Sequence, residues 1–112
     1  MQAYELPTLI SQRETTNKLY FEFLKVPDLS MGLYVLPAGG TDPQSPHTED
    51  EVYYIVSGRA HILVAEENLA VRAGSIVYVP KNVAHRFHSI EEHLTVLVFF
   101  APAEYSATQK FK

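Results

Sequence analysis

The chain has 112 residues, of which 46% are hydrophobic and 20% charged, so its size suits one soluble domain around one core, and its composition does not indicate disorder. Nine Lys and Arg residues against 13 Asp and Glu residues give a net charge of −4, which argues against a nucleic-acid partner. Because the chain contains no cysteine, disulfides are excluded and any metal must be held by nitrogen and oxygen ligands. With no basic leader and no apolar run long enough for a bilayer, we expect a cytoplasmic protein without a membrane partner.

Residues 1–17 form an N-terminal segment with weak secondary-structure signals, consistent with no more than one short turn of helix. The segment nevertheless carries Tyr4, Leu6, Leu9 and Ile10, whose apolar surfaces need burial. We therefore predict that it contacts a second subunit in a homodimer with C2 symmetry.

Residues 18–101 consist of short apolar or alternating runs separated by turn residues, with no sustained apolar repeat at helical spacing. This pattern predicts an all-β fold in a single domain covering residues 1–112. The expected strands are Lys18 to Val26, Met31 to Leu36, Glu51 to Val56, Arg59 to Ala65, Leu69 to Arg72, Ser75 to Val79, Ala84 to Ser89, and Leu94 to Phe100. The tail, residues 102–112, is polar enough to be mobile or to contact a neighbouring chain.

Two imidazoles and a carboxylate occur at spacings that suit a metal site inside a small β-barrel. His47 and Glu51 are four residues apart, where a proline-rich loop becomes a strand, and His85 opens a separate strand. If the two strand starts lie side by side, the three side chains form the two-histidine, one-carboxylate set that is typical of non-haem Fe(II) sites. The same ligands suit Mn, Zn, Ni or Co nearly as well, so the identity of the divalent metal stays open.

These residues belong to two spaced motifs through which the chain resembles the cupin superfamily, and within it the small single-domain bacterial proteins. The matching residues are His47, Glu51 and Gly58 in the first motif, and Gly74, Pro80 and His85 in the second. The resemblance implies a double-stranded β-helix, that is, a jelly-roll barrel of two packed antiparallel sheets, often dimeric, with a metal in the barrel mouth.

Three positions depart from the cupin motifs. Ser45 stands where the first histidine belongs, Asn82 replaces a glycine, and Ser89 replaces the terminal asparagine. A serine hydroxyl is a poor metal ligand at neutral pH, so the site is a three-ligand site, recruits Glu49 as a fourth ligand, or is empty. Asn is a mild replacement because it tolerates left-handed backbone better than most residues.

Structural roles compete with the metal site for each of these residues. His47 and Glu51 could be a loop histidine and a strand-edge carboxylate, and His85 could be a barrel histidine bonded to backbone or to Glu51. Glu49 and Asp50 are expected to be solvated charges. Three further histidines are expected outside the site: His61, His88 and His93. The residues expected to line the pocket are Ser45, Tyr53, Phe87 and Phe99, although the three aromatic ones also suit the core.

Three functions therefore remain open from the sequence. The first is an enzyme, dioxygenase-like or isomerase-like, that uses a divalent metal on a small-molecule substrate, as the cupin resemblance implies. No general base is evident for it beyond Glu49 and Tyr53. The second is a non-catalytic small-ligand-binding or sensor protein with a weak or absent metal site. The third is a structural dimer whose pocket is a relic.

Overall fold

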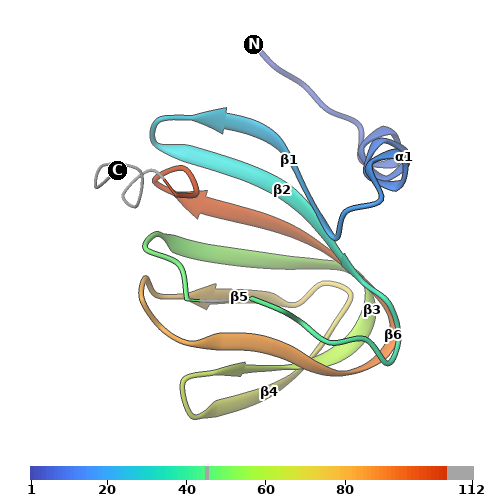
Figure 1. The fold of residues 1–112 in the computed structure, drawn as a ribbon, viewed down its shortest axis with the longest axis vertical. Coiled ribbons are helices and arrows are strands. Elements are labelled where there is room, and N and C mark those ends of the chain that lie inside the picture. The colour runs from blue at the N-terminus through green and yellow to red at the C-terminus, as the bar shows by residue number, and fades with distance from the viewer. Residues whose placement is uncertain (45, 106–112) are drawn as a thin grey trace.

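The computed structural model describes residues 1–44 and 46–105. Ser45, which was expected to line the pocket, and most of the predicted tail lie outside these residues. The elements are α1 (Leu6–Thr16), β1 (Tyr20–Val26), β2 (Leu29–Leu36), β3 (Asp50–Val64), β4 (Glu67–Arg72), β5 (Ile76–Val79) and β6 (His85–Ala101), arranged as in Figure 1. Within the described part of the chain, no helix has the length and apolar character needed to cross a membrane.

The strands form one antiparallel system in the order β1-β2-β6-β3-β4, with β5 also paired to β3. The long strands β3 and β6 each combine two of the shorter strands expected from the sequence, and they run beside each other across the molecule (Figure 1). The first half of β3 pairs with β5 and the second half with β4. The predicted all-β class and double-stranded β-helix are confirmed.

A bend in the middle of β3 lets this one strand take part in both halves of the sheet system. The register between β3 and β6 shifts repeatedly between Ile55 and His61, as happens where β-bulges bend a strand. Gly58, at the centre, has φ 96°, and a Cβ atom there would lie 2.3 Å from the carbonyl oxygen of His93. Glycine is therefore required at this close approach of two backbones.

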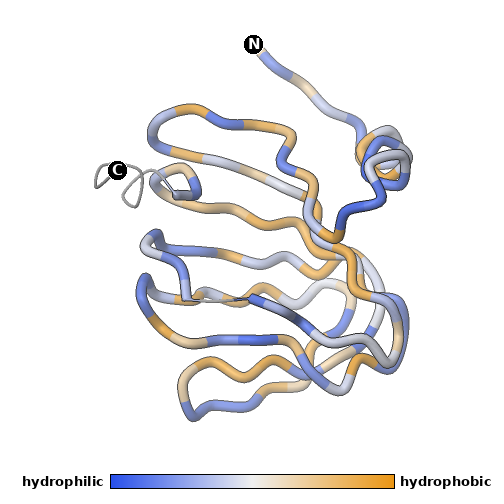
Figure 2. Tube along the Cα trace, in the orientation of Figure 1, coloured by the Kyte–Doolittle hydropathy of each residue, from blue (hydrophilic) through white to orange (hydrophobic). Residues whose placement is uncertain are grey.

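The core fills the concave side of the curved sheet system with residues from alternate positions of the strands. Along β3, for example, Tyr53, Ile55 and Ile62 are almost fully buried. Figure 2 shows hydrophobic segments along the strands and hydrophilic segments at several of the turns. The largest fully buried side chains of this core are Tyr53, Phe87, Phe100, Leu36, Ile55, Ile62 and Leu94.

The N-terminal segment forms a helix of 11 residues, longer than the single turn expected from the sequence. Proline in its first turn and Asn17 in a left-handed conformation after its last turn favour these two ends. Leu9 packs with Leu33 and Val35 on the outer side of the sheet and is buried within its own chain. Burial of Leu9 therefore does not require a second subunit, and the homodimer stays a prediction.

Candidate metal centre

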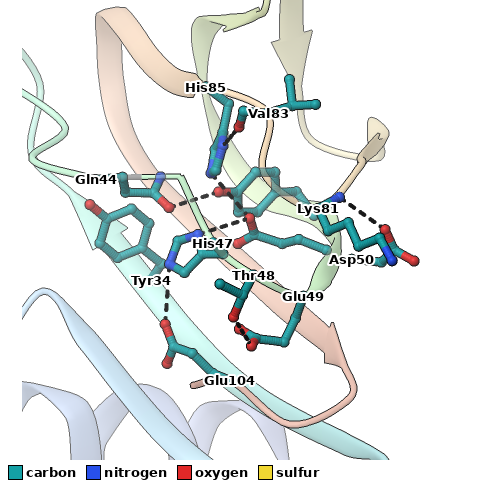
Figure 3. A network of polar contacts seen from close by, with 12 residues as sticks. Tyr34, Gln44, His47, Thr48, Glu49, Asp50, Lys81, Val83, His85 and Glu104 are labelled. Carbon is teal, nitrogen blue, oxygen red and sulfur yellow. Dashed lines mark hydrogen bonds and ion pairs between the residues drawn. The ribbon is translucent and has the colours of Figure 1, made fainter. Parts of the chain in front are cut away.

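The structure brings together the three side chains that the sequence singled out as ligands. Figure 3 labels two of them, His47 and His85, in a close view of the site. His47 lies on the loop before β3, Glu51 is the second residue of β3, and His85 is the first residue of β6. One nitrogen or oxygen atom from each lies within 4.8 Å of the others. Glu51 and His85 are buried, and the side chain of His47 is 10% exposed, so the cluster is largely shielded from water.

A backbone hydrogen bond joins the loop of His47 to the turn that precedes His85. The N–H of Asn82 donates to the carbonyl oxygen of His47 at 2.7 Å. Asn82 has φ 64°, in the left-handed region that Asn tolerates, so the replacement of the motif glycine preserves this turn. The positions of the two imidazoles are thus coupled through the backbone.

Each imidazole has one nitrogen directed toward Glu51 and the other bonded elsewhere. Nδ1 of His85 lies 2.9 Å from the carbonyl oxygen of Val83, which can only accept, so Nδ1 carries the proton and Nε2 points at Glu51 Oε1, 3.1 Å away. Nε2 of His47 lies 3.2 Å from Glu104 Oε2, while its Nδ1 lies 3.6 Å from Glu51 Oε1. Such outer partners fix the orientation of histidine ligands in metal sites.

The atoms that face one another in the cluster make no hydrogen bond of good geometry, although His85 Nε2 and Glu51 Oε1 lie only 3.1 Å apart. They are His47 Nδ1, His85 Nε2 and both carboxylate oxygens of Glu51. Leaving a buried polar group without a partner costs about 1–3 kcal/mol. A cation bound between them would provide the missing partner to all three side chains, and two imidazoles with one carboxylate are suitable donors for a divalent transition metal. The residues present therefore fit such an ion.

The electrostatic environment of His85 combines two opposing effects. Burial lowers the pKa of His85, but the Glu51 carboxylate and the Val83 carbonyl more than compensate, so the pKa of His85 lies above its usual value. A protonated His85 paired with Glu51 is accordingly the structural alternative to a metal at this position.

Glu49 is buried, contrary to the expectation of a solvated charge, and it does not join the three-residue cluster. Its Oε1 accepts a hydrogen bond of 3.0 Å from the N–H of Tyr105, and its Oε2 accepts from the hydroxyl of Thr48. The carboxylate is thus engaged with the segment that follows β6, and this contact explains its burial. Asp50 accepts from the N–H of Lys81 at 3.0 Å on a more exposed side.

Residues 102–105, here called the C-terminal strap, supply a site residue that the sequence reasoning missed. Glu104 is 6% exposed, and its N–H donates to the hydroxyl of the fully buried Ser30 at 2.8 Å. This anchor holds the Glu104 carboxylate against His47. The antiparallel register could have revealed the contact, because Ala101 pairs with Asp50 and the chain beyond β6 must therefore run beside the loop of His47.

A cavity of about 330 Å³ adjoins the cluster, with His47, Glu51 and Glu104 in its wall. Of the residues expected to line it, Tyr53 and Phe87 instead pack against each other in the core, with ring centroids 4.9 Å apart. The sequence reasoning instead missed several residues that line the cavity: Tyr20, Tyr34, Val98 and Phe100.

The expectation that Phe99 lines the cavity is wrong. Alternation along β6 directs Phe100 inward and Phe99 to the opposite face, where Phe99 lies with Val52, Tyr54 and Ile76. The other histidines lie apart from the cluster: His61 and His88 stack on each other with centroids 5.5 Å apart, and His93 is exposed.

Comparison with known proteins gives concordant results. The family model described as Cupin domain matches residues 32–100. An uncharacterized protein of Streptomyces coelicolor is 51% identical over 104 residues, which are 93% of this chain and 99% of that protein. The fold is similar to that of an RmlC-like cupin family protein of Methanocaldococcus jannaschii, with TM-score 0.73, 23% identity and 91% of each chain covered. It is also similar to KdgF from Halomonas sp., with TM-score 0.68, 20% identity, and 74% of this chain and 76% of that chain covered.

Proposed function

The chain belongs to the cupin family, and from this membership we propose that it binds one divalent metal ion through His47, Glu51 and His85 and acts on a small molecule in the adjoining cavity. The reaction that we propose is of the dioxygenase or isomerase type. The single observation that carries the proposal is the set of buried, mutually facing donor atoms that have no hydrogen-bond partner. Buried polar atoms without partners call for an explanation, and an ion bound between these side chains would supply one.

The protein side chains have separate roles in this proposal. When bound, the metal would supply a Lewis acid for an oxygen of the substrate or a centre for redox chemistry. Glu51 provides the negative charge that neutralises part of the ion, and the two imidazoles present one nitrogen each. Glu104 and the Val83 carbonyl hold the remote nitrogens of His47 and His85, which keeps both rings oriented.

A second candidate function is non-catalytic binding of a small ligand, as in a sensor. It is favoured by the bonding of the two residues that the sequence offered as general bases. Glu49 is engaged by Tyr105 and Thr48, and the hydroxyl of Tyr53 donates to Gln44 at 2.9 Å. Burial raises the pKa of Tyr53, so this phenol stays protonated rather than serving as a base.

The test is the metal content of protein purified without an affinity tag, measured by plasma mass spectrometry. The wild-type protein is compared with the double variant His47→Ala, His85→Ala and with His93→Ala, which removes an exposed histidine outside the cluster. We expect one equivalent of Fe, Mn, Zn, Ni or Co per chain in the wild type and in His93→Ala, and none in the double variant. Circular dichroism checks that all three proteins are folded.

A negative result would be decisive. If, after reconstitution with each of the five ions, the wild type contains no more metal than the folded double variant, the metal site does not exist. In that case the second candidate, a ligand-binding barrel in which His85 pairs with Glu51, becomes the better description of the protein.

A further inference from the structure

We propose that the cavity selects neutral or cationic small molecules over carboxylates and phosphates, and that the Tyr20 hydroxyl donates a hydrogen bond to a ligand that carries an oxygen acceptor. This inference names the ligand class of the site in the proposed function and rests on that function. Three features of the cavity carry it: its charges, one unbonded hydroxyl and its apolar wall.

The charged groups of the cavity wall are unfavourable for an anion. Glu51 and Glu104 contribute two carboxylates, while no Arg or Lys is found among the lining residues that the structure describes. A divalent ion at the cluster would be balanced by these two carboxylates, so the loaded site has no excess positive charge for a further anion. Sites that bind carboxylates or phosphates ordinarily supply Arg, Lys or several N–H donors.

Tyr20 supplies a buried phenol of the wall whose bonding is incomplete. Its hydroxyl is buried and has no hydrogen-bond partner within the described residues, whereas the hydroxyl of Tyr34 donates to Asp42. Burial, together with the carboxylates of Glu104, Glu22 and Glu51, raises the pKa of Tyr20, so the phenol stays protonated. In the proposed complex, a small movement of the ring would let this protonated, buried hydroxyl donate to an acceptor atom of the ligand, which would complete its bonding.

The backbone is shaped to hold the Tyr20 ring at this place. The ring lies over Gly32 of β2, where a Cβ atom would lie 2.2 Å from the ring and its hydroxyl oxygen. It meets the rings of Tyr34 and Phe100 edge-on, with centroids 6.1 Å and 6.4 Å away. The absence of a side chain on Gly32 thus allows a fixed orientation of the hydroxyl, as a specificity contact requires.

Much of the remaining wall is apolar and indicates a ligand with an apolar part. The apolar lining residues are Leu19, Pro43, Pro46, Val98 and Phe100. A cavity of about 330 Å³ lies at the lower end of the range for small-molecule sites, so ligands of roughly one ring are of suitable size.

The experiment compares three probes that share one ring and differ in charge: benzamide, benzylammonium and benzoate. Binding is measured by isothermal titration calorimetry at neutral pH, with protein reconstituted with the ion that the metal analysis identifies and again after chelation. We expect benzamide and benzylammonium to bind at least about tenfold more tightly than benzoate in both preparations. Tyr20→Phe should lower the affinity for benzamide by about tenfold. It should leave the affinity for benzylammonium unchanged, because benzylammonium has no oxygen acceptor. Tyr4→Phe, outside the cavity wall, is the control.

Equal or tighter binding of benzoate would overturn the charge selection, and unchanged benzamide affinity in a folded Tyr20→Phe would overturn the role of Tyr20. If none of the probes binds, the cavity is not a ligand site of this class and the inference fails. Its failure is separate from that of the proposed function, because metal content is measured independently. Selective binding of the probes by a protein without metal would contradict only the proposed metal site. Bound metal without selective binding of the probes would contradict only this inference.

Discussion

The two faces of the strand pair β3 and β5 differ in which side chains they expose to solvent. On the inner face, Glu51 is buried and its carboxylate oxygens have no hydrogen-bond partner. On the outer face, Tyr54, Ile76 and Tyr78 are 39%, 71% and 57% exposed. Polar atoms are thus enclosed on one side and apolar side chains are open to solvent on the other, although successive residues of the same strands supply both. Fold stability depends mainly on the inner apolar positions, whereas enclosing the carboxylate of Glu51 is unfavourable for folding and points to binding.

Two isoleucines on the opposite faces offer the largest contrast. Ile55 is fully buried on the inner side, and Ile76 is 71% exposed on the outer side. We expect Ile55→Ala to lower the free energy of unfolding by about 2–5 kcal/mol, because it leaves a cavity in the core. Ile76→Ala should change it by no more than about 0.5 kcal/mol. Urea denaturation followed by circular dichroism measures both, and similar losses would mean that the outer face is covered.

The next contrast is between two carboxylates. Glu51→Gln should lower metal affinity by at least about 100-fold, because the neutral amide removes the anionic ligand of the cluster. Glu67→Gln alters an exposed glutamate on β4 and should leave the affinity unchanged. Competition with a chromophoric chelator gives the two constants. Retention of wild-type affinity by Glu51→Gln would remove Glu51 from the set of ligands.

The C-terminal strap allows a smaller and more specific test. Glu104→Gln keeps the size of the side chain but replaces the carboxylate that lies 3.2 Å from His47 Nε2. We expect metal affinity to fall by about tenfold, the lower end of the range for residues that orient a ligand. Glu92→Gln, which alters a half-exposed side chain paired with Arg59, is the control in the same chelator assay. Equal affinities in the two variants would show that the strap does not orient His47.

The smallest expected effect is a dependence of stability on pH, which disappears near neutral pH. Burial raises the pKa of Tyr20, Tyr34 and Tyr53 above the ordinary value of 10.0. In the unfolded chain these phenols would lose their protons near pH 10, while in the folded protein they keep them. The unfolded state therefore binds fewer protons above this pH, and the stability contributed by the three phenols falls as the pH rises. Thermal unfolding from pH 8 to 11 should show a decreasing midpoint above pH 10; a constant midpoint would contradict the raised pKa values.

The motif spacings predicted much of the site because its ligands lie at the starts of two strands. Pairing between β3 and β6 does not bring the ligands together, because the two strands are antiparallel and His85 pairs with Val64 at the far end of β3. His85 reaches the cluster through β5, because Val79 pairs with Glu51 and the turn after β5 leads directly to His85. The strap contact of Glu104 depends on the register between β3 and β6, which no local pattern encodes. The same limitation explains the error at Phe99, because an entirely apolar run has no alternation to indicate which residues face inward.

Local signals also explain where the predicted elements differ from the observed ones. β3 was expected as two strands because Gly58 indicates a turn. In the structure, the positive φ of Gly58 instead allows a bulge within one continuous strand. The helix α1 was underestimated because its apolar residues do not form a strong repeat. Its boundaries were nevertheless marked by a proline in the first turn and by Asn17 after the last.

The hydrogen bond between Asn82 and His47 has a consequence for kinetics. Because this one bond ties the loop of His47 to the turn that precedes His85, a local opening that breaks it would free both imidazoles in a single event. At a pH high enough for every opening to lead to exchange, the rate at which the amide proton of Asn82 exchanges with deuterium equals the opening rate, and it would then set an upper limit on the rate of escape of anything held between the two rings. A slow amide at this turn would mean a long residence time, even for an occupant held by only three side chains.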